Sequence, residues 1–168
     1  MSLAAKRLQM ERVQFKKRHP FGFFARYTTK TDGTQDMMKW RCGVKMDEDG
    51  PWHGATVEMH MEFSEDYPGR PPKVILCQIG GATCFHPNIY PSGAVCLSIL
   101  NEDKDWRPTL TVTTILNGIK DLLNNPNPNS PAQEDAYKVY IEDDKHEKWH
   151  KKVKEQSELI KSGKAYTD

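Results

Sequence analysis

Two stretches of the chain alternate between apolar and polar residues, at residues 40–46 and 57–63. A period of two over seven residues is typical of an antiparallel strand with one face on the core and the other in water. Residues 23–29, which precede an Asp-Gly turn, and residues 73–77 have the composition of two further strands. The pattern therefore predicts a four-stranded antiparallel meander.

A helix is predicted before this sheet. Ser2 is its candidate N-cap, and it ends before Pro20, because the residue that precedes a proline avoids the helical region. One face of this helix carries Ala5, Leu8, Arg12 and Phe15.

Helical spacing returns after a long irregular stretch at residues 80–108. Residues 111–123 carry an apolar stripe that stops before Pro126. In residues 130–141, Ser130 is a candidate N-cap, Pro131 suits the first helical position and Gln133 completes a capping box. The last helix, at about 143–161, is lysine-rich with a thin apolar stripe, so we expect it to pack weakly.

The chain has 168 residues, of which 37% are hydrophobic and 28% are charged. These values fit one domain, residues 1–168. We expect the residues after about 160 to form a flexible tail. Helices that precede and follow an antiparallel meander define an α+β fold class. No apolar run approaches the roughly 20 residues that a membrane helix needs, and the N-terminus lacks the apolar centre of a signal peptide. We therefore expect no membrane association.

Charge is unevenly distributed, although the formal net charge is only +1. Residues 1–19 hold six basic residues against the single acid Glu11. This segment is either a solvated helix face or a docking surface for an acidic partner. Nucleic acid is not expected as a partner, because no aromatic-rich stacking motif accompanies the charge.

The four cysteines are not arranged as CxxC pairs, which argues against a structural zinc site. Without a secretory signal, reduced thiols in the nucleus and cytoplasm are expected. Cys42 and Cys77 lie in predicted strands and are expected to be buried and inert, whereas Cys84 is undetermined. Cys96 lies between a glycine turn and a short apolar patch, where a thiol is both fixed and reachable. It is the candidate nucleophile.

The sequence HEKWH at residues 146–150 matches the HExxH pattern of zinc proteases. The predicted helix is lysine-rich and near the C-terminus, with little chain left to supply a third ligand. We therefore expect no metal here, and no other cofactor is implied.

The run FHPNIYPSGAVCLSIL, at residues 85–100, resembles the active-site segment of the ubiquitin-conjugating enzyme family, with the thioester cysteine at Cys96. YPGRPPK at 67–73, WRP at 106–108 and PAQEDAY at 131–137 fit the same family. The resemblance covers residues 1 to about 160. It implies an N-terminal helix, a four-stranded meander, an active-site loop and then helices, which is the order that the periodicity predicts.

Within the family, the resemblance is closest to the branch that conjugates SUMO. The acidic-basic insertion in NEDKDWRP, at 101–108, and the basic end of the first helix, KKRHPFGF at 16–23, carry it. This implies an enzyme that accepts SUMO from the SUMO-activating enzyme as a thioester on Cys96 and passes it to lysines of substrate proteins, with SUMO ligases as further partners. Ubiquitin or another modifier, or a modifier-binding scaffold, are the alternatives.

The resemblance also implies roles for individual residues. Asn88 is expected to donate to the thioester oxygen or only to stabilise its loop, and His86 is expected to be structural. The lysine slot beside the nucleophile is expected to be formed by Tyr90, Ser130 and Tyr137. Substrate-binding positions are Lys73, Ser92, Asp103 and Lys104. Positions that bind the modifier and the activating enzyme are Arg12, Lys16 and His19.

The chain departs from this branch at several of these places. Ser130 replaces a usual acid, so it either caps a helix or leaves the lysine slot uncharged until it is phosphorylated. Ala94 replaces a threonine and Ile75 a lysine, and residues 73–86 span about four residues more than usual. Direct recognition of the sequence around the target lysine is therefore expected to be weaker. Val13 replaces a lysine on the partner-binding helix, which should reduce affinity there.

Overall fold

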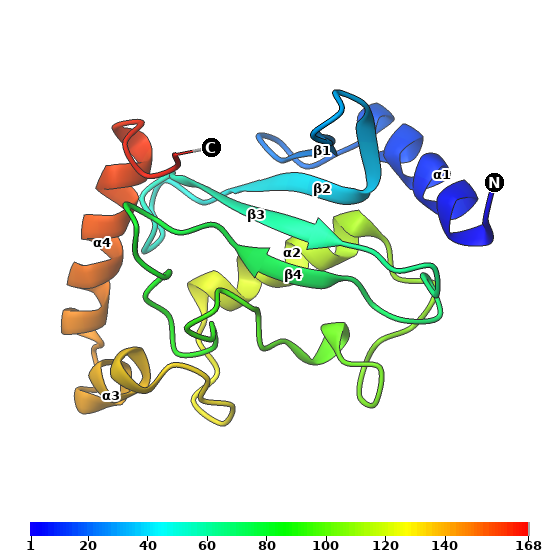
Figure 1. Ribbon diagram of the computed structural model, residues 1–168. Coiled ribbons are helices and arrows are strands. Elements are labelled where there is room, and N and C mark those ends of the chain that lie inside the picture. The colour runs from blue at the N-terminus through cyan, green and yellow to red at the C-terminus, as the bar shows by residue number, and fades with distance from the viewer. Residues whose placement is uncertain (168) are drawn as a thin grey trace.

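The computed structural model describes residues 1–167. Its four strands pair in the order β1-β2-β3-β4, all antiparallel, as the periodicity predicts. They are β1 (Phe24–Thr29), β2 (Gln35–Lys45), β3 (Thr56–Glu62) and β4 (Lys73–Leu76). Figure 1 shows α2 (Val112–Asn124) lying across one face of the sheet. The α+β fold class and the meander are confirmed.

The core lies between α2 and the inner face of the sheet. Every second residue of β3 is buried, and these residues face buried partners on β2: Trp40 pairs with Met61, Cys42 with Met59 and Val44 with Val57. On α2, the buried side chains repeat at helical spacing on the face toward the sheet. Thr111 caps this helix by accepting from the Thr114 amide at 3.3 Å.

The first helix, α1 (Leu3–Lys17), is capped by Ser2, whose Oγ accepts from the Ala5 amide at 3.0 Å. Its predicted cap is confirmed, but its buried face is offset from the predicted one. The buried residues are Ala4, Leu8, Glu11 and Phe15. Glu11 can be buried because its carboxylate finds polar partners, whereas Arg12 lies on the flank of the helix.

Residue Ser130 does not cap a helix, so this part of the prediction is wrong. The helix α3 (Glu134–Glu142) begins four residues later. The amides of Ala132 and Gln133 both donate to the Pro87 carbonyl, at 2.7 and 3.2 Å, so they bind the loop around Pro87 instead of beginning a helix at Pro131. The Gln133 side chain donates to the Cys84 and Ile89 carbonyls at 2.9 and 3.0 Å instead of closing a capping box.

The last helix, α4 (Glu147–Lys161), packs more tightly than its composition suggests. Trp149 and Val153 are buried, and the Trp149 indole donates to the Phe85 carbonyl at 3.1 Å. Gln156 binds the same loop, accepting from the Phe85 amide at 2.8 Å and donating to the Thr83 carbonyl at 3.0 Å. The expectation of weak packing is therefore wrong.

Residues 162–167 fold back onto the sheet instead of forming the flexible tail that we expected. Ala165 is buried, and its carbonyl accepts from the Gly80 amide at 2.9 Å. The Tyr166 hydroxyl donates to the Thr56 carbonyl at 3.1 Å and accepts from the Glu58 amide at 3.0 Å. The residues around 80–83 thus form a turn that contacts the C-terminal segment.

Within residues 1–167, no helix combines the length and the apolar character needed to cross a membrane.

Candidate active site

Cys96 lies on a short hairpin formed by residues 88–96. The Cys96 amide donates to the Asn88 carbonyl and the Tyr90 amide to the Ala94 carbonyl, both at 2.9 Å. The turn between them requires Gly93, whose φ is +92° and whose missing Cβ would lie 2.7 Å from the Leu76 carbonyl oxygen. The Leu76 amide donates to the Gly93 carbonyl at 2.8 Å. The hairpin is therefore fixed to the edge of the sheet, and Cys96 with it.

His86 holds the base of this hairpin and does not face Cys96. It is fully buried, its Nε2 lies 2.7 Å from the Leu122 carbonyl and its Nδ1 accepts from the Asn88 amide at 3.0 Å. Burial lowers the pKa of His86 to about 4, and the hydrogen bond to Leu122 only partly opposes this shift. The imidazole is therefore neutral near pH 7 and carries its proton on Nε2. This is the structural role that the sequence predicts.

Asn88 is also buried, and its side chain is fully hydrogen-bonded. Its Nδ2 donates to the carbonyls of Asn127 and Ser130 at 2.8 and 2.7 Å, while its Oδ1 accepts from the Asn127 amide at 2.7 Å. These bonds join the Cys96 hairpin to the segment that precedes α3. Donation to a thioester oxygen would require Asn88 to give up one of them, so that role stays a prediction beside the loop-stabilising one that the geometry favours.

Cys96 is half-buried at a cavity of about 280 Å³. Three of the predicted residues share this cavity with it: Tyr90, Ser130 and Lys104. The remaining lining residues are uncharged: Val95, Leu97, Ser98, Leu100, Asn101, Leu122 and Asn127. Thus an apolar wall, three hydroxyl groups, two amides and one cation surround the thiol, and none of the described residues that line the cavity is an Asp or Glu.

The other predicted site residues lie outside this cavity. Tyr137 is half-buried on α3, and Lys73 is exposed at the first position of β4. Ser92 lies in the hairpin turn, where its Oγ accepts from the Ala94 amide at 3.3 Å. Asp103 is exposed in the loop before Trp106. The sequence analysis did not identify Asn127 and Leu122 as cavity residues. They lie near Cys96 only because of tertiary packing, which no local sequence motif predicts.

The remaining cysteines differ in exposure. Cys42 and Cys84 are buried, and desolvation raises both thiol pKa values, that of Cys42 to about 12. Cys77, predicted to be buried, is instead half-exposed, and its sulfur lies 3.9 Å from Nδ1 of His60. The burial prediction is therefore correct for Cys42 and wrong for Cys77.

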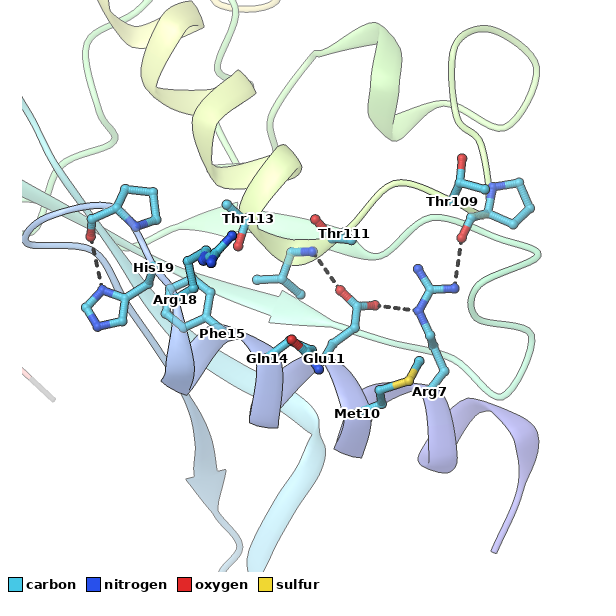
Figure 2. A pocket seen from close by; sticks show the side chains of 13 residues that line it. Arg7, Met10, Glu11, Gln14, Phe15, Arg18, His19, Thr109, Thr111 and Thr113 are labelled. Carbon is cyan, nitrogen blue, oxygen red and sulfur yellow. Dashed lines mark hydrogen bonds and ion pairs between the residues drawn. The ribbon is translucent and has the colours of Figure 1, made fainter.

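A second cavity, of about 1040 Å³, lies between α1 and the start of α2 (Figure 2). His19 lines it, with its ring stacked on Phe15 at a centroid distance of 5.3 Å. Arg18 extends into it toward Thr113, as Figure 2 shows. Arg12 and Lys16, one turn apart on α1, lie outside this groove. The three residues predicted to bind the modifier and activating enzyme therefore lie on two surfaces: Arg12 and Lys16 on α1 outside the groove, and His19, just after the helix, in it.

Glu11 forms the floor of this groove, which the sequence reasoning missed (Figure 2). Its carboxylate accepts from the Val112 amide at 2.7 Å, from Arg7 Nε at 3.0 Å and from the Tyr67 hydroxyl. The Arg7 guanidinium also donates to the Pro108 and Leu110 carbonyls at 2.8 and 3.0 Å. The sequence did contain a signal for this role: Glu11 is the only acid in residues 1–19, and its spacing from Leu8 and Phe15 places it on the buried face of the helix.

The first histidine of the HEKWH motif, His146, packs against the nearby Tyr140. The His146 ring stacks on Tyr140 at 3.7 Å between centroids, and its Nδ1 lies 2.6 Å from the Tyr140 carbonyl. Over residues 1–167, no group of three or more His, Cys, Asp and Glu side chains is arranged to hold a metal ion.

The sequence model of the ubiquitin-conjugating enzyme family matches residues 7–157. The chain belongs to this family. Cys96 and its hairpin lie within the matched residues.

Three known proteins are similar to the chain over most of its length. The Sumo-conjugating enzyme ubc9 of Dictyostelium discoideum is 46% identical over 157 residues, 94% of this chain and 95% of its own. The SUMO-conjugating enzyme SCE1 of Arabidopsis thaliana is 48% identical over 155 residues, 92% of this chain and 93% of its own. The SUMO-conjugating enzyme UBC9 of Caenorhabditis elegans is 43% identical over 155 residues, 92% of this chain and 90% of its own.

Proposed function

We propose that this protein is a SUMO-conjugating enzyme. It accepts SUMO from the SUMO-activating enzyme as a thioester on Cys96 and transfers it to the lysine side chains of substrate proteins. One observation carries the proposal: a half-buried thiol, fixed beside a cavity, in a chain aligned over more than nine tenths of its length with three SUMO-conjugating enzymes.

Charging of Cys96 is a thioester exchange. The thiolate attacks the carbonyl carbon of the activated modifier, forms a new C–S bond and displaces the thiol of the activating enzyme. In the second step, a lysine amine attacks the same carbonyl carbon, and the Cys96 thiolate leaves.

The difficulty of the second step is the protonated amine. Its ordinary pKa is about 10.4, so deprotonation near pH 7 costs about 5 kcal/mol. The apolar wall of the Cys96 cavity, formed by Leu97, Leu100 and Leu122, removes water from the ammonium and lowers its pKa. Lys104 at the same cavity disfavours a second positive charge and acts in the same direction. Ser130 adds no opposing negative charge.

The basic surface of α1 is the proposed docking site for SUMO and its activating enzyme. Arg12 is half-buried and Lys16 exposed, and the one acid of residues 1–19, Glu11, is buried. Its charge therefore does not cancel the basic residues at the surface. SUMO ligases are the remaining proposed partners, and the nucleus and cytoplasm are the proposed compartments, because all four cysteines are free thiols.

A side-by-side charging assay tests the choice of modifier. The protein is incubated with ATP and either SUMO with its activating enzyme or ubiquitin with its own, and the reactions are compared on non-reducing gels. We expect a reductant-sensitive adduct with SUMO alone. An adduct formed equally fast with ubiquitin would contradict the assignment to SUMO and leave a conjugating enzyme for another modifier.

A further inference from the structure

The hairpin register brings the Tyr90 side chain to the same face as Cys96. Ile89 pairs with Val95 in an antiparallel bridge, so the flanking positions Asn88, Tyr90, Ala94 and Cys96 all point to the other face. Tyr90 and Cys96 are then diagonal neighbours across the two strands, a separation that an aromatic side chain can span. Both side chains line the same cavity.

Ala94 leaves the space between these two side chains open. It lies directly opposite Tyr90, and its amide and carbonyl are held by the hairpin, to Ser92 Oγ and the Tyr90 amide respectively. A single methyl group there cannot block the path of the tyrosine ring toward the sulfur. Tyr90 is 44% exposed, so its ring packs lightly and its hydroxyl is free to turn toward the thiol.

The electrostatics agree with this placement. The Cys96 sulfur raises the pKa of Tyr90, first as a hydrogen-bond partner and then as a negative charge, with a smaller contribution from burial. The direction of this pKa shift favours the protonated form of the Tyr90 hydroxyl, which can act as a donor. Among the described residues that line the cavity, Lys104 is the only other titratable side chain besides Cys96.

We propose that the Tyr90 hydroxyl donates a hydrogen bond to the Cys96 sulfur and stabilises its thiolate form. This inference rests on the proposed function and adds a catalytic role to a residue otherwise expected to be only a wall of the lysine slot. In charging, the bond increases the fraction of thiolate. In transfer, it stabilises the leaving group: the C–N bond forms, the C–S bond breaks, the electron pair stays on sulfur and the amine proton passes to solvent.

Alkylation of the unloaded protein tests the hydrogen bond without any modifier. The rate of reaction of Cys96 with iodoacetamide is followed by mass spectrometry of the Cys96 peptide, from about pH 6 to about pH 10, because the thiolate is the reactive form. Tyr90→Phe removes the hydroxyl and keeps the ring. We expect the midpoint of the profile to rise by about 0.5 to 1 unit and the rate near pH 7 to fall about three- to tenfold.

Two further variants separate this effect from others. Tyr140→Phe removes a hydroxyl on α3 outside the cavity and should leave the Cys96 profile unchanged. Lys104→Met also raises the midpoint if its charge acts on the thiolate, but that effect should fade at high salt, whereas the Tyr90 effect should persist. Superimposable profiles for Tyr90→Phe and the parent protein, or a Tyr90 effect that salt abolishes, would overturn the proposal.

Loaded enzyme provides the second readout. Single-turnover discharge of the Cys96 thioester to free lysine should slow about three- to tenfold in Tyr90→Phe, in step with the shift in the alkylation profile. If the protein proved to carry a modifier other than SUMO, the alkylation result would still stand. If SUMO charging succeeded and the alkylation profile did not move, the inference alone would fail.

Discussion

Removal of the Glu11 carboxylate should destabilise the protein strongly, although Glu11 lies in a surface helix. In Glu11→Ala, the Val112 amide and the Tyr67 hydroxyl lose their acceptor, and these residues are only 1% and 2% exposed. The surrounding side chains screen both donors from bulk water, so water can reach them only through the space that the carboxylate leaves at the floor of the groove. Arg7 loses its ion pair but keeps its bonds to Pro108 and Leu110.

The size of the effect follows from these contacts. A buried donor left without a partner costs about 1–3 kcal/mol, and breaking a buried charged pair costs about 3–5 kcal/mol in all. We therefore expect Glu11→Ala to lose about 3–5 kcal/mol of unfolding free energy. That is a large part of the roughly 5–15 kcal/mol that holds a domain folded. Glu11→Gln keeps the shape and one acceptor oxygen, so its loss should be about half as large.

Urea unfolding measures these differences, with the slope compared between variants to establish that the denatured state is unchanged. Glu155→Ala, on the exposed side of α4, is the matched control and should stay within about 0.5 kcal/mol of the parent. A double-mutant cycle with Tyr67→Phe should give a coupling energy of about 1 kcal/mol or more. A loss below about 1 kcal/mol in Glu11→Ala would refute the view that this carboxylate joins α1 to α2.

Three further predictions concern the site and its surfaces. Burial lowers the pKa of His86 to about 4, so between about pH 6.5 and about pH 4 the unfolded chain binds a proton that the folded protein does not. The unfolding free energy should therefore fall by up to about 3 kcal/mol as the pH drops through this range. When the urea midpoint is measured against pH, the parent protein should lose stability over this range and His86→Gln should not. Parallel pH dependences for the two proteins would contradict the prediction. Ser130→Asp places a carboxylate at the Cys96 cavity, where it stabilises the ammonium form of the incoming lysine. The pH profile of lysine discharge should therefore shift to higher pH relative to that of Ser130→Asn, with charging of Cys96 intact. Identical profiles would show that Ser130 does not face the lysine. Arg12→Glu with Lys16→Glu should weaken binding to SUMO and its activating enzyme about tenfold or more at low salt and less at high salt, and unchanged affinity in a salt titration would leave only a solvated helix face.

The parts of the fold with a strong local signal were predictable from the sequence. The alternation in β3 reflects one face on the core and one in water, and it survives in the structure as alternating burial. The Ser2 cap is a contact between residues three positions apart, so the sequence contains both partners. The run around Cys96 could single out this thiol as the candidate nucleophile because the residues that carry the resemblance are contiguous, and in the structure residues 88–96 form one hairpin.

Features set by distant contacts were not predictable. Ser-Pro-Ala-Gln is a good helix start in isolation, but the Pro87 carbonyl takes two of its amides and delays α3 until Glu134. In the sequence, Glu11 has the features of an exposed charged residue. Its burial is favourable only because Val112 and Tyr67, which are distant in the chain, donate hydrogen bonds to it. The Cys96 cavity was also not predictable from the local sequence, because part of its lining comes from α2 and the segment after it.

The most direct test of the account is the intact mass of the protein after incubation with SUMO, its activating enzyme and ATP. We expect one SUMO adduct on the parent protein that is lost on treatment with a thiol reductant. In Cys96→Ser the adduct should resist the reductant, since an oxyester replaces the thioester, and in Cys96→Ala it should be absent. A reductant-sensitive SUMO adduct on Cys96→Ala would contradict the assignment of Cys96 as the nucleophile, and the absence of any adduct on the parent protein would contradict the proposed function itself.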